Sequence, residues 1–182
     1  MREISLHILD IAENAIRAGA MRIEIEVEAD RQADTLTVTV RDDGCGMPPE
    51  ILAGVKDPFV STRTERKVGL GLPLLAANCE ATGGSLDVQS KPGRGTTVKA
   101  VFGLSHIDRP PMGALHETVR TLAAGNEERR IVLRVRSEKG EFEFDSDTVK
   151  AALDGVPLSS PPVAGWLKEH LREGIAGALD LV

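Results

Sequence analysis

The sequence of 182 residues is poor in cysteine, and it has no excess of positive charge. Its two cysteines, Cys45 and Cys79, have no metal-ligand spacing. This excludes a disulfide scaffold and a zinc finger, and it fits a reducing compartment. The 28 acidic and 22 basic residues leave a net charge of −6. Because non-specific binding to nucleic acid needs excess positive charge, we expect no nucleic-acid partner.

Long apolar runs are also missing. No stretch of the chain approaches the roughly 20 apolar residues of a membrane span. The N-terminus, MREISLHILDIAENA, lacks the apolar core and the cleavage site of a signal peptide. We therefore expect a cytoplasmic protein without a membrane partner. The chain is long enough to bury a sizeable core without disulfides or metals.

The first part of the chain shows helical and strand periodicity in turn. Apolar residues at spacings of four, three and four predict a helix over about 4–18. Strict alternation predicts strands over 22–28 and 35–41, each with one polar face, as in an open sheet. Loops are indicated at 42–50, by its glycines and prolines, and over about 57–68.

A second helix and two more strands complete the first 104 residues. The helix is predicted over about 71–82, where two glycines end it, and the strands around 86–90 and 97–102. Helices thus alternate irregularly with about four strands. This order predicts an α+β fold, a two-layer α/β sandwich.

Two prolines interrupt the pattern within residues 105–113, which we interpret as a linker. Beyond it we expect a helix, a hairpin over about 131–145, a short helix, and a final helix from residue 161 with prolines in its first turn. We therefore predict two units, residues 1–104 and a small α/β C-terminal extension, 114–182, to which the sequence assigns no role.

Asp42 is the most informative single residue. It continues the period of the apolar residues in the strand 35–41, so its carboxylate is aimed at the core face. A buried carboxylate is costly unless it is hydrogen-bonded. Beyond it, Gly44 and Gly46 would let a ligand approach the backbone closely. The pattern predicts a receptor for a ligand amine. The alternative is a solvated turn residue at a fraying strand end.

The first helix carries a second polar pair. Asp10 and Asn14 are four residues apart and share one face. Carboxylate and amide oxygens suit Mg²⁺, which keeps its waters and takes few protein ligands. Arg17 lies on the same side, where it could meet phosphate. An ordinary polar helix face is the alternative interpretation.

Two glycine motifs give weaker signals. GLGL, residues 69–72, opens a helix after a basic loop, and backbone N–H groups at such a start bind phosphate. It lacks the third glycine of a dinucleotide fingerprint, and no P-loop lysine follows. In GRGTTV, residues 93–98, Thr96 has the phase that turns its hydroxyl toward the same interior as Asp42. A plain β-hairpin with threonines would give the same pattern.

In their order and spacing, these segments resemble the ATP-binding domain of the GHKL superfamily, shared by DNA gyrase, the large heat-shock chaperone, sensor histidine kinases and MutL. DIAENAIRAGA is similar to its asparagine box, DDGCGM and GLGLPLL to its two glycine boxes, and GRGTTV to its closing strand motif. DPFVSTR, residues 57–63, resembles the segment that enters the nucleotide lid of histidine kinases. The resemblance covers about residues 1–104 and implies a Bergerat-type ATP-binding fold.

The resemblance implies ATP and Mg²⁺ as ligands and gives each matching residue a role. Asp42 would hydrogen-bond the adenine amine, and Asn14 would ligate Mg²⁺. Asp10 falls where the ATPases of the superfamily carry a glutamate that activates water. The other implied contacts are Gly44 and Gly46 at the base and ribose, Thr96 near the adenine, and Gly69 and Gly71 at the phosphates, with Arg63 or Lys67 assisting from the lid.

Arg17 favours the histidine kinase branch. Gyrase, the chaperone and MutL resemble one another in having an aspartate at this place, whereas histidine kinases usually have a basic residue. PFVSTR and GLGLPLL also look kinase-like, while ENAIRAGA and GCGM echo MutL. Asp10 is one methylene shorter than the ATPase glutamate, and histidine kinases often carry an asparagine there.

A histidine kinase needs a helical hairpin with an acceptor histidine ahead of its ATP domain, and here the asparagine box begins almost at Met1. We therefore expect a stand-alone kinase that transfers phosphate from ATP to a separate protein, as anti-sigma serine kinases do. The alternative is an ATP-gated interaction module or a slow ATPase, in which the extension contacts a partner or a second copy in a homodimer. The acidic balance disfavours a MutL-like ATPase on DNA.

Overall fold

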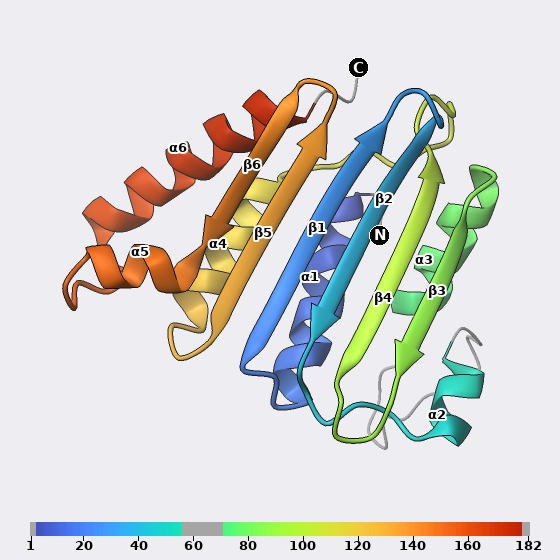
Figure 1. The fold of residues 1–182 in the computed structure, drawn as a ribbon, viewed down its shortest axis with the longest axis horizontal. Helices are drawn as coiled ribbons and strands as arrows, with labels where there is room; N and C mark the ends of the chain where they lie inside the picture. Colours follow the sequence, from blue (N-terminus) through green and yellow to red (C-terminus); the bar gives the residue numbers. More distant parts are fainter. Residues whose placement is uncertain (1–2, 56–70, 180–182) are drawn as a thin grey trace.

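The computed structural model describes residues 3–55 and 71–179 (Figure 1). Within these ranges six strands form one sheet, in the order β3-β4-β2-β1-β5-β6. The strands are β1 (Arg22–Asp30), β2 (Thr35–Asp42), β3 (Ser85–Ser90), β4 (Thr96–Gly103), β5 (Arg130–Ser137) and β6 (Gly140–Asp145). The helices are α1 (Ile4–Arg17), α2 (Pro49–Gly54), α3 (Gly71–Ala81), α4 (Leu115–Gly125), α5 (Ser146–Ala152) and α6 (Pro161–Ala178).

The helices α1, α3, α4 and α6 pack on one face of the sheet, as Figure 1 shows. This confirms the predicted α+β fold with two layers. The helices and strands expected from periodicity are all present, with ends that differ by a few residues. The short helix α2 was not predicted, because Pro48 and Pro49 indicate a loop. Proline is nevertheless tolerated in the first turn of a helix, where its missing N–H is not needed.

The C-terminal residues extend the same sheet. β5 lies parallel to β1, with Arg22 opposite Arg130, and β6 then pairs antiparallel to β5. Parallel neighbours need a crossover connection, and α4 lies in the segment that leads to β5. The two units predicted from the sequence, 1–104 and 114–182, therefore share one sheet.

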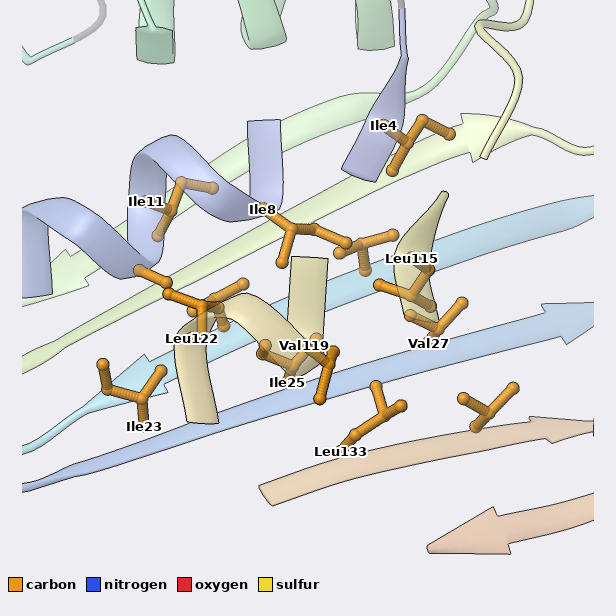
Figure 2. Packing of buried hydrophobic residues seen from close by; sticks show 14 of the residues in the cluster. Ile4, Ile8, Ile11, Ile23, Ile25, Val27, Leu115, Val119, Leu122 and Leu133 are labelled. Atoms are coloured by element: carbon orange, nitrogen blue, oxygen red, sulfur yellow. The ribbon is translucent and has the colours of Figure 1, made fainter. Parts of the chain in front are cut away.

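One core joins these two parts, and α1 lies at its centre (Figure 2). The apolar stripe of α1 faces β1 and also contacts α4, so both the sheet and a neighbouring helix hold α1. The side chains that pack there are Ile4, Ile8 and Ile11 of α1, Ile23, Ile25 and Val27 of β1, Leu115, Val119 and Leu122 of α4, and Leu133 of β5. Full burial of one such side chain contributes about 1.5–3 kcal/mol. The opposite, polar side of α1 is thereby fixed in place.

The other face of the sheet carries charged side chains in cross-strand pairs. Arg134 on β5 lies 3.5 Å from Glu26 on β1 and 2.8 Å from Glu143 on β6. Glu26 also pairs with Arg41 on β2 at 3.0 Å. Such exposed pairs each contribute little to stability, but they account for the strict alternation in the sequence.

Among the described helices, none has both the length and the apolar character that crossing a bilayer requires.

Candidate functional site

The candidate residues that the structure describes gather at one end of the sheet. Asp42 is the last residue of β2, and it pairs with Thr96, the first residue of β4. The glycine loop, residues 43–47, follows Asp42. From its middle to its C-terminal end, α1 carries Asp10, Asn14 and Arg17, and α3 begins with Gly71. Arg63, Lys67 and Gly69 lie outside the described residues.

Asp42 is a half-buried hydrogen-bond acceptor. Its Oδ1 accepts the backbone N–H of Gly44 at 2.8 Å. Burial raises the pKa of Asp42 above its ordinary value, and hydrogen bonds from the backbone of Gly44 and Thr96 oppose this rise. An ionised carboxylate offers about four acceptor positions. The loop therefore orients this carboxylate without exhausting its capacity to accept further donors.

Two turns hold the glycine loop from opposite sides. On one side, Cys45 donates its N–H to the carbonyl oxygen of Ala18, at 2.9 Å, in the α1–β1 turn, residues 18–21. On the other side, Gly93 donates to the carbonyl oxygen of Cys45 at 2.8 Å, from the β3–β4 turn, residues 91–95. The backbone of the loop is thus fixed between segments that are far apart in the sequence.

Packing within the protein requires the two glycines of this loop. Gly46 has φ +67°, and a Cβ there would lie 2.0 Å from the carbonyl oxygen of Lys91. A Cβ on Gly44 would lie 2.9 Å from Asp42 Oδ1 and 3.0 Å from Ala18 Cβ. The sequence indicated that these glycines admit a ligand. The structure shows that these glycines also allow the turns 18–21 and 91–95 to pack against the loop.

Sequence reasoning missed two residues that support this loop. Asp43 Oδ1 accepts the N–H groups of Met21 at 2.8 Å and Arg22 at 2.9 Å. An aspartate just after a strand end is a typical acceptor for backbone N–H groups, and this was the available signal. The carboxylate of Asp43 ties the loop to the start of β1.

Ser90 is the second missed residue, and it ties the loop to β4. Its Oγ accepts the N–H of Met47 at 2.8 Å and lies 2.9 Å from Thr96 Oγ1. It also donates to the carbonyl oxygen of Gly95 at 3.0 Å. The hydroxyl of Thr96 is therefore engaged with Ser90 beside Asp42. No signal in the sequence distinguished Ser90 from other strand serines.

At the other end of the site, α3 begins against Asp10. A Cβ on Gly71 would lie 1.9 Å from Asp10 Oδ2, so any larger residue there would displace the carboxylate from this position. The start of a helix carries a partial positive charge that favours a nearby anion. The half-buried carboxylate of Asp10 thus occupies a favourable position beside the first residue of α3.

His7 connects α1 to α3 one turn before Asp10. Its Nε2 lies 3.0 Å from Nδ2 of Asn78 on α3. Burial lowers the pKa of His7 to about 4, although the carboxylate of Asp10 favours the charged form. The imidazole is therefore neutral near pH 7. With Nδ2 of Asn78 as the donor, Nε2 accepts this hydrogen bond, and Nδ1 has no hydrogen-bond partner among the described residues.

Asn14 and Arg17 are exposed and contact each other. Arg17 donates from Nη2 to Asn14 Oδ1 at 2.5 Å, and its Nη1 lies 3.7 Å from Glu13 Oε2. Among the described residues, no three His, Cys, Asp or Glu side chains gather as a metal cluster. The amide oxygen of Asn14 is a hard donor that suits Mg²⁺. It fits as a single protein ligand, which the Arg17 guanidinium would have to release.

Comparison with known proteins identifies the family. Residues 2–106 match the family described as "Histidine kinase-, DNA gyrase B-, and HSP90-like ATPase". Since the match covers more than half of the 182 residues, the chain belongs to this family, the GHKL superfamily. The resemblance stated from the sequence motifs is confirmed, and it makes the chain a histidine kinase-like, ATP-binding domain protein.

The chain is also similar to several curated bacterial proteins. It is 37% identical over 110 residues to the "Sensor protein kinase FleS" of Pseudomonas aeruginosa, which covers 60% of this chain and 27% of that protein. It is 31% identical over 96 residues to "Sporulation kinase C" of Bacillus subtilis, covering 53% and 22%. A third relative is the "Non-motile and phage-resistance protein" of Caulobacter vibrioides, at 33% over 117 residues, covering 59% and 14%. The chain thus spans about a quarter or less of the length of these curated relatives.

A solved structure shares the fold over a larger part of the chain. It is described as the "Crystal Structure of N terminal domain of a DNA repair protein", with a TM-score of 0.56 and 15% identity. The likeness covers 80% of this chain and 52% of that one. At this identity it shows the fold alone.

Proposed function

We propose that this chain binds ATP together with Mg²⁺ and transfers the terminal phosphate to a separate protein. The observation that carries the proposal is the half-buried carboxylate of Asp42, oriented by the glycine loop in a chain of an ATPase family. The kinase relatives support phosphate transfer over other uses of ATP.

Asp42 is the group that would recognise the base. Adenine presents an exocyclic amine, which donates to a carboxylate, whereas guanine presents a carbonyl oxygen at the same place. A carboxylate facing that carbonyl would leave two acceptors in contact, and sites built on a hydrogen bond reject analogues that cannot form it. Thr96, Gly44 and Gly46 border the same end of the site. We therefore expect ATP to be preferred over GTP.

The phosphates would lie between α1 and the start of α3. Backbone N–H groups at the start of a helix bind phosphate, and Gly71 provides this start. The guanidinium of Arg17 adds positive charge on the same side of α1. Arg63, Lys67 and Gly69 stay expected contributors from the lid. Mg²⁺, held by Asn14 and phosphate oxygens, would neutralise charge on the phosphates.

Asp10 would position the acceptor hydroxyl of the partner protein. Phosphoryl transfer depends mainly on geometry and on stabilisation of charge, so one oriented carboxylate suffices for this role. Asp10 is held against α3 and lies one turn beyond the buried His7. Because the reaction consumes ATP, we place the protein in the cytoplasm.

Following the terminal phosphate of γ-labelled ATP tests the proposal. The purified protein is incubated with labelled ATP, Mg²⁺ and a lysate fraction, and a matched sample contains the Asp42→Ala variant. We expect label on another protein with the wild type and, at ATP concentrations below the dissociation constant, roughly 10- to 150-fold less with the variant. Label that stays on ATP, with binding shown by competition, would instead support the ATP-gated interaction module. Label released as free phosphate would identify a slow ATPase.

A further inference from the structure

The α1–β1 turn, residues 18–21, stands between the glycine loop and the C-terminal part of the chain. The glycine loop is attached to this turn through the N–H of Cys45, which donates to Ala18, and through Asp43 Oδ1, which accepts from Met21 and Arg22. Any displacement of the turn would therefore move the loop that follows Asp42. Contacts that fix the α1–β1 turn therefore also fix the glycine loop, at the end of the site that would hold the base.

The C-terminal part of the chain contacts the other side of the same turn. Arg129, just before β5, donates from Nη1 to the carbonyl oxygen of Ala20. The N–H of Arg130 donates to the carbonyl oxygen of Met21 at 2.9 Å, where β5 begins to pair with β1. Two consecutive residues outside the family match at 2–106 thus hold two consecutive carbonyls of the turn.

Arg129 is itself held rigidly. Lys150 on α5 donates to the carbonyl oxygens of Glu127, at 2.8 Å, and Arg129, at 3.0 Å. Glu127 Oε1 accepts from the N–H of Ser159 at 3.1 Å and from its Oγ at 2.9 Å. These contacts fix the segment between α4 and β5 from two later parts of the chain. A guanidinium presented from such a support can maintain the position of the turn.

The side chain of Arg129 is suited to hold a carbonyl strongly. Only 16% of the side chain is exposed, and its Nε lies 3.1 Å from Glu128 Oε1. A hydrogen bond from an ionised donor is roughly twice as strong as a neutral one, and removing it leaves the Ala20 carbonyl without this donor. We therefore expect the contact to be stronger than a neutral backbone hydrogen bond.

We propose that Arg129 is a positioning residue, which braces the glycine loop through the α1–β1 turn and so sets the affinity of the site for the base. The inference rests on the proposed ATP site and gives the C-terminal extension a part in it. The brace acts mainly on the adenine end, because the turn is bonded to the glycine loop through Ala18, Met21 and Arg22, whereas the phosphate end is built from α3 and the polar face of α1.

Hydrogen exchange tests the brace without any nucleotide. The Arg129→Met variant keeps the apolar stem and removes the donors, and Arg129→Lys restores a charged donor. Arg136→Met is the matched control, because Arg136 lies on β5, seven residues after Arg129, but pairs with Glu28 on the exposed face. We expect the amides of Met21 and Cys45 to exchange about 3- to 30-fold faster in Arg129→Met, the range typical for residues that couple two sites. Arg129→Lys should restore most of the protection, and the control should match the wild type.

Calorimetry with ATP and with adenosine then tests the consequence for the site. We expect Arg129→Met to weaken both ligands by the same factor, about 3- to 30-fold, since both present the base. A loss confined to ATP, unchanged affinities with unchanged exchange, or a lysine variant as impaired as the methionine variant would each overturn the proposal. If the wild type bound neither ligand, the proposed function would fail, and the exchange rates would still decide whether Arg129 braces the loop.

Discussion

Replacing Asp42 with alanine should remove most of the affinity for ATP and leave the fold intact. The carboxylate is half-buried, and its Oδ1 is bonded to Gly44 N at 2.8 Å. A hydrogen bond to a charged group contributes about 1.5–3 kcal/mol, which corresponds to roughly a 10- to 150-fold rise in the dissociation constant. The fold should lose little, because the variant gives up the Gly44 hydrogen bond but also relieves the cost of burying a charge.

Isothermal calorimetry with ATP measures this loss, and thermal melting shows whether the variant is folded. Asp87→Ala is a matched control, because Asp87 is exposed on β3 and accepts a hydrogen bond from the side chain of the exposed Gln89. Its affinity for ATP should equal that of the wild type. An undiminished affinity in a folded Asp42→Ala protein would refute the assignment of Asp42 as the receptor for the base.

The same carboxylate predicts a dependence on pH. Because burial raises the pKa of Asp42 above 3.8, the folded protein takes up a proton at a higher pH than the unfolded chain does. The carboxylate therefore destabilises the fold at neutral pH, and this cost disappears as the pH falls through the raised pKa. Affinity for ATP should decline over the same interval, since a protonated carboxyl is a weaker acceptor, and Asp42→Asn should abolish this part of the pH profile.

Two further predictions concern the loop and the helix contact. Gly46→Ala should destabilise the fold by about 1–3 kcal/mol because its Cβ meets the Lys91 carbonyl. The control is Gly93→Ala, because Gly93 has φ +71° and open space where the Cβ would lie. It should lose only the smaller free energy of unfolding that a positive φ costs, and urea unfolding of both variants measures the two losses. For His7, a pKa lowered from 6.5 to about 4 means that stability is lost as the pH falls from 6.5 through 4. The loss should reach up to about 3 kcal/mol and be absent from His7→Gln.

The position of Asp42 could be predicted because strand alternation fixes which face a residue occupies. The helical repeat likewise placed Asp10 and Asn14, four residues apart, on one face of α1. The docking of β5 beside β1 could not be predicted, because the hairpin pattern of 131–145 does not say which strand it joins. That choice depends on contacts between residues more than 100 apart in the sequence, such as Arg22 with Arg130.

Supporting residues were harder to predict than candidate ligands. Asp43 and Ser90 support the glycine loop through ordinary side chain to backbone hydrogen bonds. The position of Asp43 just after a strand end was a signal for such an acceptor, but no signal in the sequence distinguished Ser90 from other strand serines. The glycines were predicted, but the reason was incomplete. The carbonyl of Lys91, which excludes a side chain at Gly46, comes from a turn more than 40 residues away.

The two ends of the site depend on different parts of the chain, and α1 joins them. The turns at 18–21 and 91–95 hold the glycine loop, and Arg129 contacts the first of these two turns. The phosphate end depends on how closely α3 approaches Asp10, which the hydrogen bond between His7 and Asn78 helps to set. Because α1 is packed against both β1 and α4, it is the fixed reference for both ends. A change at Arg129 should therefore weaken recognition of the base, and a change at His7 should act on the phosphates, with little coupling between the two.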